Sequence, residues 1–171
     1  KSVRPDPSYL QAIREICNKY DVILIFDECT SGFREAFGGM HLNYDLKPDL
    51  CVLGKTLGNG FPITCVLGTK KVMLESSASF ISSTFWTERI GFVAALATLE
   101  EMDRLKSWEY ITNIGKLYRD ELTEIFNEFE IPHQWSGMPA LISYEIKLSN
   151  WLEIKTYITN ELLDLGYLHA A

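Results

Sequence analysis

Two short apolar runs, each followed by one charged residue, constrain the fold of this chain more than any other feature. Residues 22–26 (VILIF) lead into Asp27, and Leu50–Leu53 leads through one glycine into Lys55. Continuous runs rich in β-branched and aromatic residues are typical of strands buried on both faces of a sheet. Ligands of open α/β sheets bind just beyond the carboxyl ends of parallel strands. If the two runs pair in parallel, we expect Asp27 and Lys55 to meet at that end of the sheet.

This pair of side chains suits catalysis with an aldehyde cofactor that carries a pyridine ring. A lysine amine forms a Schiff base with an aldehyde, and a carboxylate keeps a pyridine nitrogen protonated so that the ring accepts electrons. An ordinary aspartate at a strand end and a solvated lysine would give the same pattern. The two runs therefore raise a functional hypothesis that the neighbouring residues have to support.

Four segments around these runs carry a resemblance to a known family. They are FDECTSGFR (26–34), LGKTLGNGFP (53–62), VLGTKKVM (66–73) and SSTFWTERIG (82–91). Together they resemble the class III aminotransferases, which use pyridoxal 5'-phosphate, have fold type I and include glutamate-1-semialdehyde aminomutase. The resemblance is close over residues 21–102 and thin after that. The D-E-x-x-x-G-F-R run and the later G-K are specific in combination, although neither is specific alone.

The resemblance implies an α/β chain of two parts. Residues 1–103 would form the C-terminal part of the large, mostly parallel-sheet domain that binds the cofactor, and residues 104–171 part of the small α+β domain. The family's catalytic chain is much longer than 171 residues, so we interpret the sequence as an internal or C-terminal piece. The dimer arm, the glycine-serine phosphate loop and the aromatic residue that stacks on the cofactor would lie upstream of it.

The hydrophobic pattern predicts helices that alternate with strands. Strands are expected over residues 22–26, 50–53, 63–67 and 141–146, and helices over residues 5–19, 70–75, 87–102, 108–129 and 151–165. As in the family, the third strand is expected to be antiparallel to an otherwise parallel sheet. The long connection over residues 30–47 contains aromatic residues, so we expect it to be packed against the domain.

Composition narrows the possible partners and the cellular setting. The formal net charge of −7 argues against nucleic acid as a partner, and the sequence has no apolar run of the roughly 18 residues that a membrane span needs. The cysteines are widely spaced without a C-x-x-C pair, which argues against a zinc site and fits a reduced, cytoplasmic protein. His41, His133 and His169 lie far apart in the sequence, so neither a metal site nor a catalytic triad is expected.

The two catalytic assignments follow from the resemblance. Lys55 is expected to form the Schiff base, and its rivals Lys70 and Lys71 open a predicted surface helix. Asp27 is expected to pair with the pyridine nitrogen of the cofactor. Its rival is Glu28, but strand alternation would turn that side chain to the opposite face.

Two further residues are candidates for contacts with the cofactor, and a third stands at a contact position without being expected to make the contact. Cys29 stands where the family usually has a valine packed on the cofactor ring, although a cysteine can also simply fill a core. Thr84 matches the family threonine that binds the cofactor phosphate across the dimer interface; a hydroxyl near a helix start is the alternative. Thr30 replaces a glutamine that reaches the phenolic oxygen in many relatives, and its side chain is too short for us to expect that contact.

Two charged positions fit the family pattern less well. Glu88 and Arg89 stand where most relatives have Asn-Pro, which indicates a different substrate or a different pairing of that loop. Arg34 can bind a substrate carboxylate, but a surface salt bridge explains it equally well.

The sequence therefore predicts a pyridoxal-phosphate aminotransferase, a homodimer that moves an amino group from an amino donor to an aldehyde or keto acceptor through Lys55. Two alternatives stay open. One is an intramolecular aminomutase, which the G-F-R-E run favours and the Glu88-Arg89 departure disfavours. The other is a non-catalytic α/β binding subunit, since half of the expected active site is missing and this piece can be inactive alone.

Overall fold

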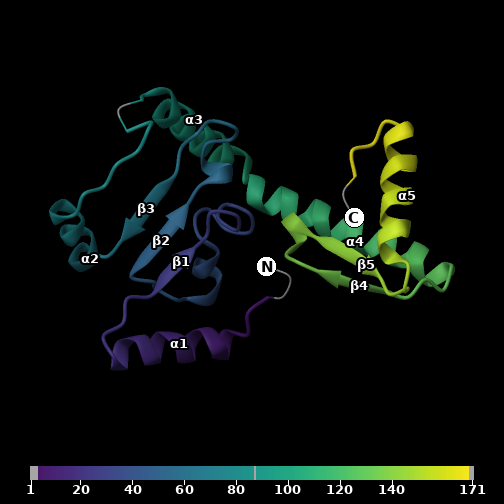
Figure 1. The fold of residues 1–171 in the computed structure, drawn as a ribbon, viewed down its shortest axis with the longest axis horizontal. Helices are drawn as coiled ribbons and strands as arrows, with labels where there is room; N and C mark the ends of the chain where they lie inside the picture. The colour runs from purple at the N-terminus through teal and green to yellow at the C-terminus, as the bar shows by residue number, and fades with distance from the viewer. Residues whose placement is uncertain (1–3, 87, 170–171) are drawn as a thin grey trace. The chain divides into compact units, whose positions relative to one another are not determined.

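The structure is a computed structural model that describes residues 4–86 and 88–169 (Figure 1). The chain separates into two compact units, one from Pro5 to Ile111 and one that begins at Thr112. The sequence-based boundary between residues 103 and 104 concerns the family's large and small domains and stays a prediction. We describe each unit by itself.

Helix α1 (Pro7–Lys19) opens the first unit and confirms the predicted helix, two residues shorter at its start. Pro7 stands in the first turn, where a missing N–H costs nothing. Asp6 caps the helix, since its carboxylate accepts a hydrogen bond of 2.7 Å from the backbone N–H of Ser8. Hydrogen bonds from the Ser8 hydroxyl and backbone lower the pKa of Asp6. Cys17 of α1 is buried against Leu24 and anchors the helix to the sheet.

A three-stranded sheet forms the centre of the first unit, in the order β1 (Ile25–Asp27), β2 (Leu50–Leu53), β3 (Cys65–Gly68). Strands β1 and β2 are parallel, and β3 is antiparallel to β2, as the sequence predicts. The expectation that the first strand is buried on both faces is wrong, because Ile25 is 54% exposed. Among the described residues β1 has β2 as its only neighbour, so one face and one edge of this strand stay uncovered.

The connection between β1 and β2 is packed, as its aromatic content predicts. Phe33 and Leu46 are both buried, and a short 3-10 helix, η1 (Met40–Tyr44), lies between them in sequence. Phe33 shares a core cluster with Leu53 of β2. The loop is therefore fixed against the sheet and can hold side chains in defined positions.

Helices α2 (Lys70–Glu75) and α3 (Ile90–Leu105) follow β3, with a short 3-10 turn, η3 (Ser76–Ala78), directly after α2. The predicted start of the second helix at residue 87 lies outside the described residues, and the helix begins at Ile90. Ala95 and Met102 of α3 are buried in one cluster with Cys51 of β2. One helix thus covers part of the sheet with small and flexible side chains.

The second unit is a small α+β structure. Helix α4 (Ser107–Glu128) begins in the first unit and continues into the second. An antiparallel hairpin follows, made of β4 (His133–Ser136) and β5 (Ser143–Ile146), with a 3-10 turn, η4 (Pro139–Leu141), between the two strands. The last helix is α5 (Trp151–Asp164). Phe126, Tyr144 and Ile146 form its buried core. Gly115 of α4 is required there, because a Cβ atom would lie 1.9 Å from the carbonyl oxygen of Pro139.

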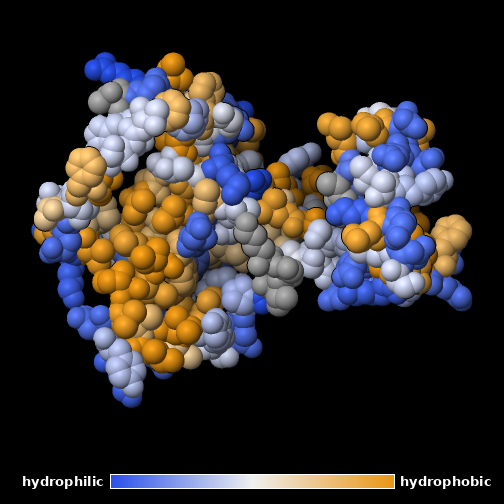
Figure 2. All heavy atoms as spheres, viewed as in Figure 1, coloured by the Kyte–Doolittle hydropathy of each residue, from blue (hydrophilic) through white to orange (hydrophobic). Residues whose placement is uncertain are grey.

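Much apolar surface of the first unit is exposed. Figure 2 shows apolar side chains gathered over its sheet, and the members with large exposed fractions include Val22, Ile23, Ile25, Val66 and Leu67. No helix in the described ranges is both long and apolar enough to cross a membrane.

Candidate active site

The backbone at the end of β2 is shaped to present Lys55. Gly54 links the strand to the 3-10 turn η2 (Lys55–Leu57). A Cβ atom on Gly54 would lie 2.8 Å from the sulfur of Cys29, so the absence of a side chain at Gly54 leaves room for Cys29 beside the end of β2. Lys55 itself has a φ of +40°, a left-handed conformation that costs free energy in a non-glycine residue. Such strain occurs preferentially at functional sites.

The amine of Lys55 crosses to the segment that follows β1. Its Nζ atom donates a hydrogen bond of 2.7 Å to Oγ1 of Thr30 and lies 3.9 Å from the sulfur of Cys29. The structure therefore brings together two of the predicted site residues, Lys55 and Cys29. It also adds Thr30, for which the sequence offered no expected contact.

Asp27 is the last residue of β1 and lies at the same end of the sheet. It is paired with Val52 in the parallel register, three positions before Lys55. Its side chain is exposed, and Oδ1 accepts a hydrogen bond of 3.1 Å from the backbone N–H of Cys29. Within the described part of the chain, no hydrogen bond or ion pair joins Asp27 directly to Lys55. The carboxylate and the amine thus share one end of the sheet without neutralising each other.

Glu28 is turned away from Asp27 and buried, as strand alternation predicts. Its carboxylate accepts hydrogen bonds from the backbone N–H groups of Met40 and His41, and it lies 2.6 Å from Nδ1 of His41. Ser31 adds a longer contact of 3.4 Å. Glu28 is therefore engaged in fixing the β1–β2 connection, and Asp27 is the exposed carboxylate of the pair.

The possible metal-ligand atoms of Glu28, His41 and Cys51 lie within 4.8 Å of one another. The wide spacing of the histidines in the sequence does not predict this cluster. Two observations account for this arrangement without a metal ion. The Glu28 carboxylate is already saturated with hydrogen bonds. Burial, with a smaller contribution from Glu28, raises the pKa of Cys51 to about 11, so the free sulfur is a protonated thiol near neutral pH. The buried cluster is explained by packing and hydrogen bonding.

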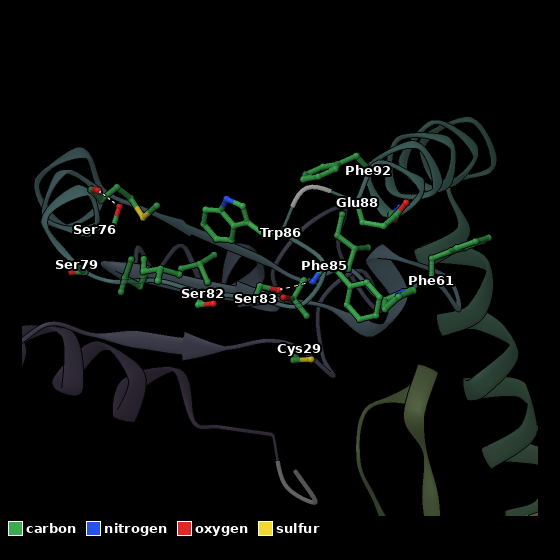
Figure 3. Close-up of a pocket in the computed structure, with 18 of the residues that line it drawn as sticks. Cys29, Phe61, Ser76, Ser79, Ser82, Ser83, Phe85, Trp86, Glu88 and Phe92 are labelled. Atoms are coloured by element: carbon green, nitrogen blue, oxygen red, sulfur yellow. Dashed lines mark hydrogen bonds between the residues drawn. The ribbon is translucent and has the colours of Figure 1, made fainter.

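A cavity of about 1310 Å³ opens beside Lys55. Figure 3 shows the rings of Phe85, Trp86 and Phe92 around it, together with Cys29. Most of its lining is apolar, and the polar groups that reach it include Lys55, Ser82, Ser83 and Glu88. A concave, largely apolar space with a few polar groups is the usual form of a small-molecule site.

Thr84 lies in the segment that borders this cavity, between Ser83 and Phe85. Both neighbours line the cavity, whereas the exposed Thr84 is not among the lining residues. Its hydroxyl forms no hydrogen bond to any residue that the structure describes. The position of Thr84 is therefore compatible with a contact to another molecule, which stays a prediction.

Glu88 has a structural task that the sequence did not reveal. Its carboxylate accepts hydrogen bonds from the backbone N–H groups of Ile90 (2.9 Å) and Gly91 (3.0 Å), the first residues of α3. These two hydrogen bonds lower the pKa of Glu88. An acidic side chain at this position thus starts the helix, and this explains why the helix begins later than predicted. Arg89 is exposed and has no ion-pair partner within the described ranges.

The rival lysines lie at the opposite end of the sheet. Gly68, the last residue of β3, is paired with Leu50, the first residue of β2, so α2 begins near the amino end of β2. Lys71 of α2 forms an ion pair of 3.5 Å with Asp21, before β1. Lys70 and Lys71 are thus separated from Lys55 by the length of β2.

The model of the family described as aminotransferase class-III matches residues 2–169. This chain belongs to the class III aminotransferase family. One relative is the 3-aminobutyryl-CoA aminotransferase of Cloacimonas acidaminovorans (strain Evry), 35% identical over 136 residues, which are 79% of this chain and 33% of that protein. Another is the glutamate-1-semialdehyde 2,1-aminomutase of Methanocaldococcus jannaschii, 35% identical over 132 residues, which are 75% of this chain and 31% of that protein.

Solved structures agree with the fold. An omega-transaminase from Sphaerobacter thermophilus matches 85% of this chain and 34% of its own length, with a TM-score of 0.73 and 29% identity. The FumI protein of Sphingopyxis sp. MTA144, in its PLP internal aldimine form, matches 98% of this chain and 41% of its own, with a TM-score of 0.90. At 22% identity this second match shows the fold alone, an α/β arrangement of fold type I. The chain spans about a third of the length of the relatives it matches.

The residues present fit the pyridoxal phosphate of the class III family. A lysine amine opens to a cavity of sufficient size, and no carboxylate among the described residues holds it in an ion pair. An exposed carboxylate stands at the end of the neighbouring strand.

Proposed function

We propose that the intact protein is a pyridoxal-phosphate-dependent aminotransferase that moves an amino group from an amino donor to an aldehyde or keto acceptor. The observation that carries the proposal is the placement of the Lys55 amine. It lies at the carboxyl end of two parallel strands, on strained backbone, and opens to a cavity. Ligand sites of open α/β sheets are found at this end.

Each residue of the site has a role in this proposal. Lys55 would hold the cofactor through Nζ, and its free amine would carry a proton to and from the substrate carbon. The Asp27 carboxylate would keep a proton on the ring nitrogen of the cofactor. The sulfur of Cys29, 3.9 Å from the Lys55 amine, would contact the cofactor ring. When bound, pyridoxal phosphate supplies an electron sink that stabilises negative charge on the substrate carbon.

Assembly as a homodimer completes the proposal. The Thr84 hydroxyl, which has no partner within the described residues, would donate to the cofactor phosphate of the neighbouring subunit. Mixing Lys55→Ala and Thr84→Val variants of the intact protein tests this, at a cofactor concentration too low for the second variant alone. If Thr84 acts across the interface, one site of each mixed dimer carries no lesion and activity returns; if it acts within its own chain, no activity returns.

An aminomutase is the second candidate, because relatives of this chain include glutamate-1-semialdehyde 2,1-aminomutases. Glu88 and Arg89 stand where the family has Asn-Pro, and the sequence alone takes this departure as evidence against an aminomutase. The structure weakens that evidence. Glu88 has a helix-capping task that accounts for its charge. The route of the amino group distinguishes the two candidates. Transfer between two molecules identifies an aminotransferase, and transfer within one molecule identifies an aminomutase.

The proposal is tested with the intact protein and pyridoxal phosphate. We expect an absorbance band of the lysine-bound cofactor that borohydride removes, and transfer of an isotopically labelled amino group from a donor to a carbonyl acceptor. A non-catalytic binding subunit would give neither the band nor the transfer. An aminomutase would give the band, and the label would stay within one molecule.

A further inference from the structure

The amine of Lys55 has one strong partner among the described residues, and it is a neutral one. Oγ1 of Thr30 accepts a hydrogen bond of 2.7 Å from Nζ, whereas the Cys29 sulfur is at 3.9 Å. We propose that Thr30 is a positioning residue whose hydroxyl holds the Lys55 amine in place whenever that amine is not covalently engaged. The inference rests on the proposed function of Lys55 and gives Thr30 a task different from the cofactor contact for which it is too short.

The hydroxyl of Thr30 is held by a rigid turn. Directly after Thr30, the backbone N–H of Gly32 donates to the carbonyl oxygen of Glu28 at 2.8 Å, and Phe33 is buried in the core. A Cβ atom on Gly32 would lie 2.7 Å from the side chain of Leu53, so the turn is pressed against β2. A β-branched side chain such as threonine also has few rotamers. The acceptor oxygen is therefore fixed relative to the strand that carries Lys55.

Lys55 needs such a partner because its own side chain is flexible. A lysine amine is a point charge on a four-carbon stem with many accessible rotamers, and the Lys55 side chain is exposed. One hydrogen bond to a fixed oxygen selects the rotamers that keep the amine at the strand ends. A neutral hydroxyl does this without the strong attraction of a carboxylate, so the amine can leave when it reacts.

The groups around the amine support this assignment. The exposed carboxylate of the segment, that of Asp27, accepts a hydrogen bond from the backbone N–H of Cys29 and none from Lys55. Glu28 is buried and bonded to His41. Thr64 lines the same cavity, but its hydroxyl makes no hydrogen bond within the described residues. Thr30 is thus distinguished from a nearby threonine by its contact with the amine.

The test uses the intact protein without cofactor, so that it does not depend on catalysis. Trace acetic anhydride labels lysine amines that are free to react, and peptide mass spectrometry compares Lys55 with the exposed Lys116 in the same sample. We expect Thr30→Val to increase the relative labelling of Lys55 about threefold to tenfold, the effect of losing one hydrogen bond. Thr30→Ser, which keeps the hydroxyl, should restore the wild-type rate, and Thr64→Val should leave it unchanged.

Two results would overturn the inference. One is labelling of Lys55 in Thr30→Val within twofold of wild type, and the other is equal labelling in Thr30→Val and Thr30→Ser. If Thr30→Val does not fold, Thr30→Ala is judged by the same criterion. Borohydride trapping in the wild type separates this from the proposed function. An adduct on Lys55 with no effect of Thr30 contradicts the inference alone, and a Thr30 effect with no adduct on Lys55 contradicts the proposed function alone.

Discussion

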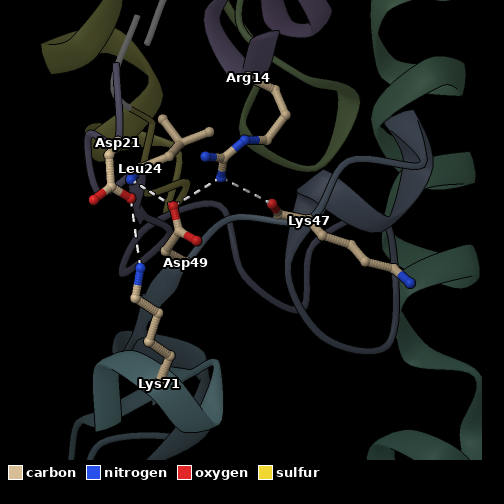
Figure 4. Close-up of polar contacts among 6 residues, drawn as sticks. All are labelled: Arg14, Asp21, Leu24, Lys47, Asp49 and Lys71. Carbon is tan, nitrogen blue, oxygen red and sulfur yellow. Dashed lines mark hydrogen bonds and ion pairs between the residues drawn. The ribbon is translucent and has the colours of Figure 1, made fainter. Parts of the chain in front are cut away.

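Charged side chains at the two ends of the sheet in the first unit have different kinds of partner. At the amino end, Asp49 accepts hydrogen bonds of 2.8 Å from the guanidinium of Arg14 and from the backbone N–H of Leu24 (Figure 4). At the carboxyl end, the amine of Lys55 is held by one neutral hydroxyl. Charged groups thus join structural elements at the amino end, whereas the Lys55 amine at the carboxyl end forms no ion pair with any described residue.

The amino end is built for stability. The guanidinium of Arg14 also donates to the carbonyl oxygen of Lys47 at 3.3 Å, so α1 is tied to the entry of β2. The hydrogen bonds from Leu24 and Arg14 lower the pKa of Asp49. The ion pair between Lys71 and Asp21 is exposed, and we expect it to contribute little. The Asp49 side chain thus makes the main stabilising contacts at this end of the sheet.

The largest effect is expected from Asp27→Asn at the carboxyl end. The amide cannot hold a proton on the ring nitrogen as a carboxylate does, and a lost charged hydrogen bond is worth roughly 1.5–3 kcal/mol. Turnover of the intact enzyme should therefore fall by about tenfold or more, while cofactor binding is partly retained. Steady-state kinetics at saturating cofactor measure it, and near-normal turnover in a folded variant would contradict the role of Asp27.

A smaller effect of another kind is expected from Asp49→Asn. Removing the negative charge weakens the contacts to Arg14 and Leu24, and we expect a loss of about 1–2 kcal/mol in the free energy of unfolding. Urea denaturation of the cofactor-free intact protein measures this. Turnover per folded molecule should stay close to wild type, and a variant that loses turnover but no stability would reverse the comparison between the two ends.

The smallest effect concerns pH. Because the pKa of Asp49 in the folded protein is lowered below its ordinary value of 3.8, its stabilising contribution is present above that value and is lost as the pH falls through the folded pKa. The difference in stability between wild type and Asp49→Asn should be constant near neutral pH and shrink below about pH 4. Denaturation series at several pH values would show this, whereas a difference that grows on acidification has the wrong sign.

The sequence predicts the strands that carry the site residues well, but it predicts the contacts of their side chains poorly. The apolar runs before Asp27 and Lys55 predict parallel neighbouring strands, which the structure confirms. The pairing of Lys55 with Thr30 joins residues 25 positions apart, and no local pattern encodes such a contact. Glu28 and His41 meet in the same way across a loop.

Two further differences have local causes. Strand β4 (His133–Ser136) was not predicted, because its sequence HQWS lacks an alternating apolar pattern and is extended by pairing with β5. Helix α3 begins at Ile90 because the side chain of Glu88 takes the first backbone N–H groups. Side chains that compete for backbone hydrogen bonds shift helix starts in ways that hydrophobic periodicity does not show.

The proposal depends on Lys55 being the lysine that binds the cofactor covalently. A peptide map identifies that lysine. The intact protein is loaded with pyridoxal phosphate, reduced with borohydride and digested, and the modified lysine is identified by mass spectrometry. We predict that the adduct lies on Lys55 and disappears in Lys55→Ala, while Lys70→Ala and Lys71→Ala retain it. An adduct on Lys70 or Lys71, or one that persists in Lys55→Ala, would contradict the account.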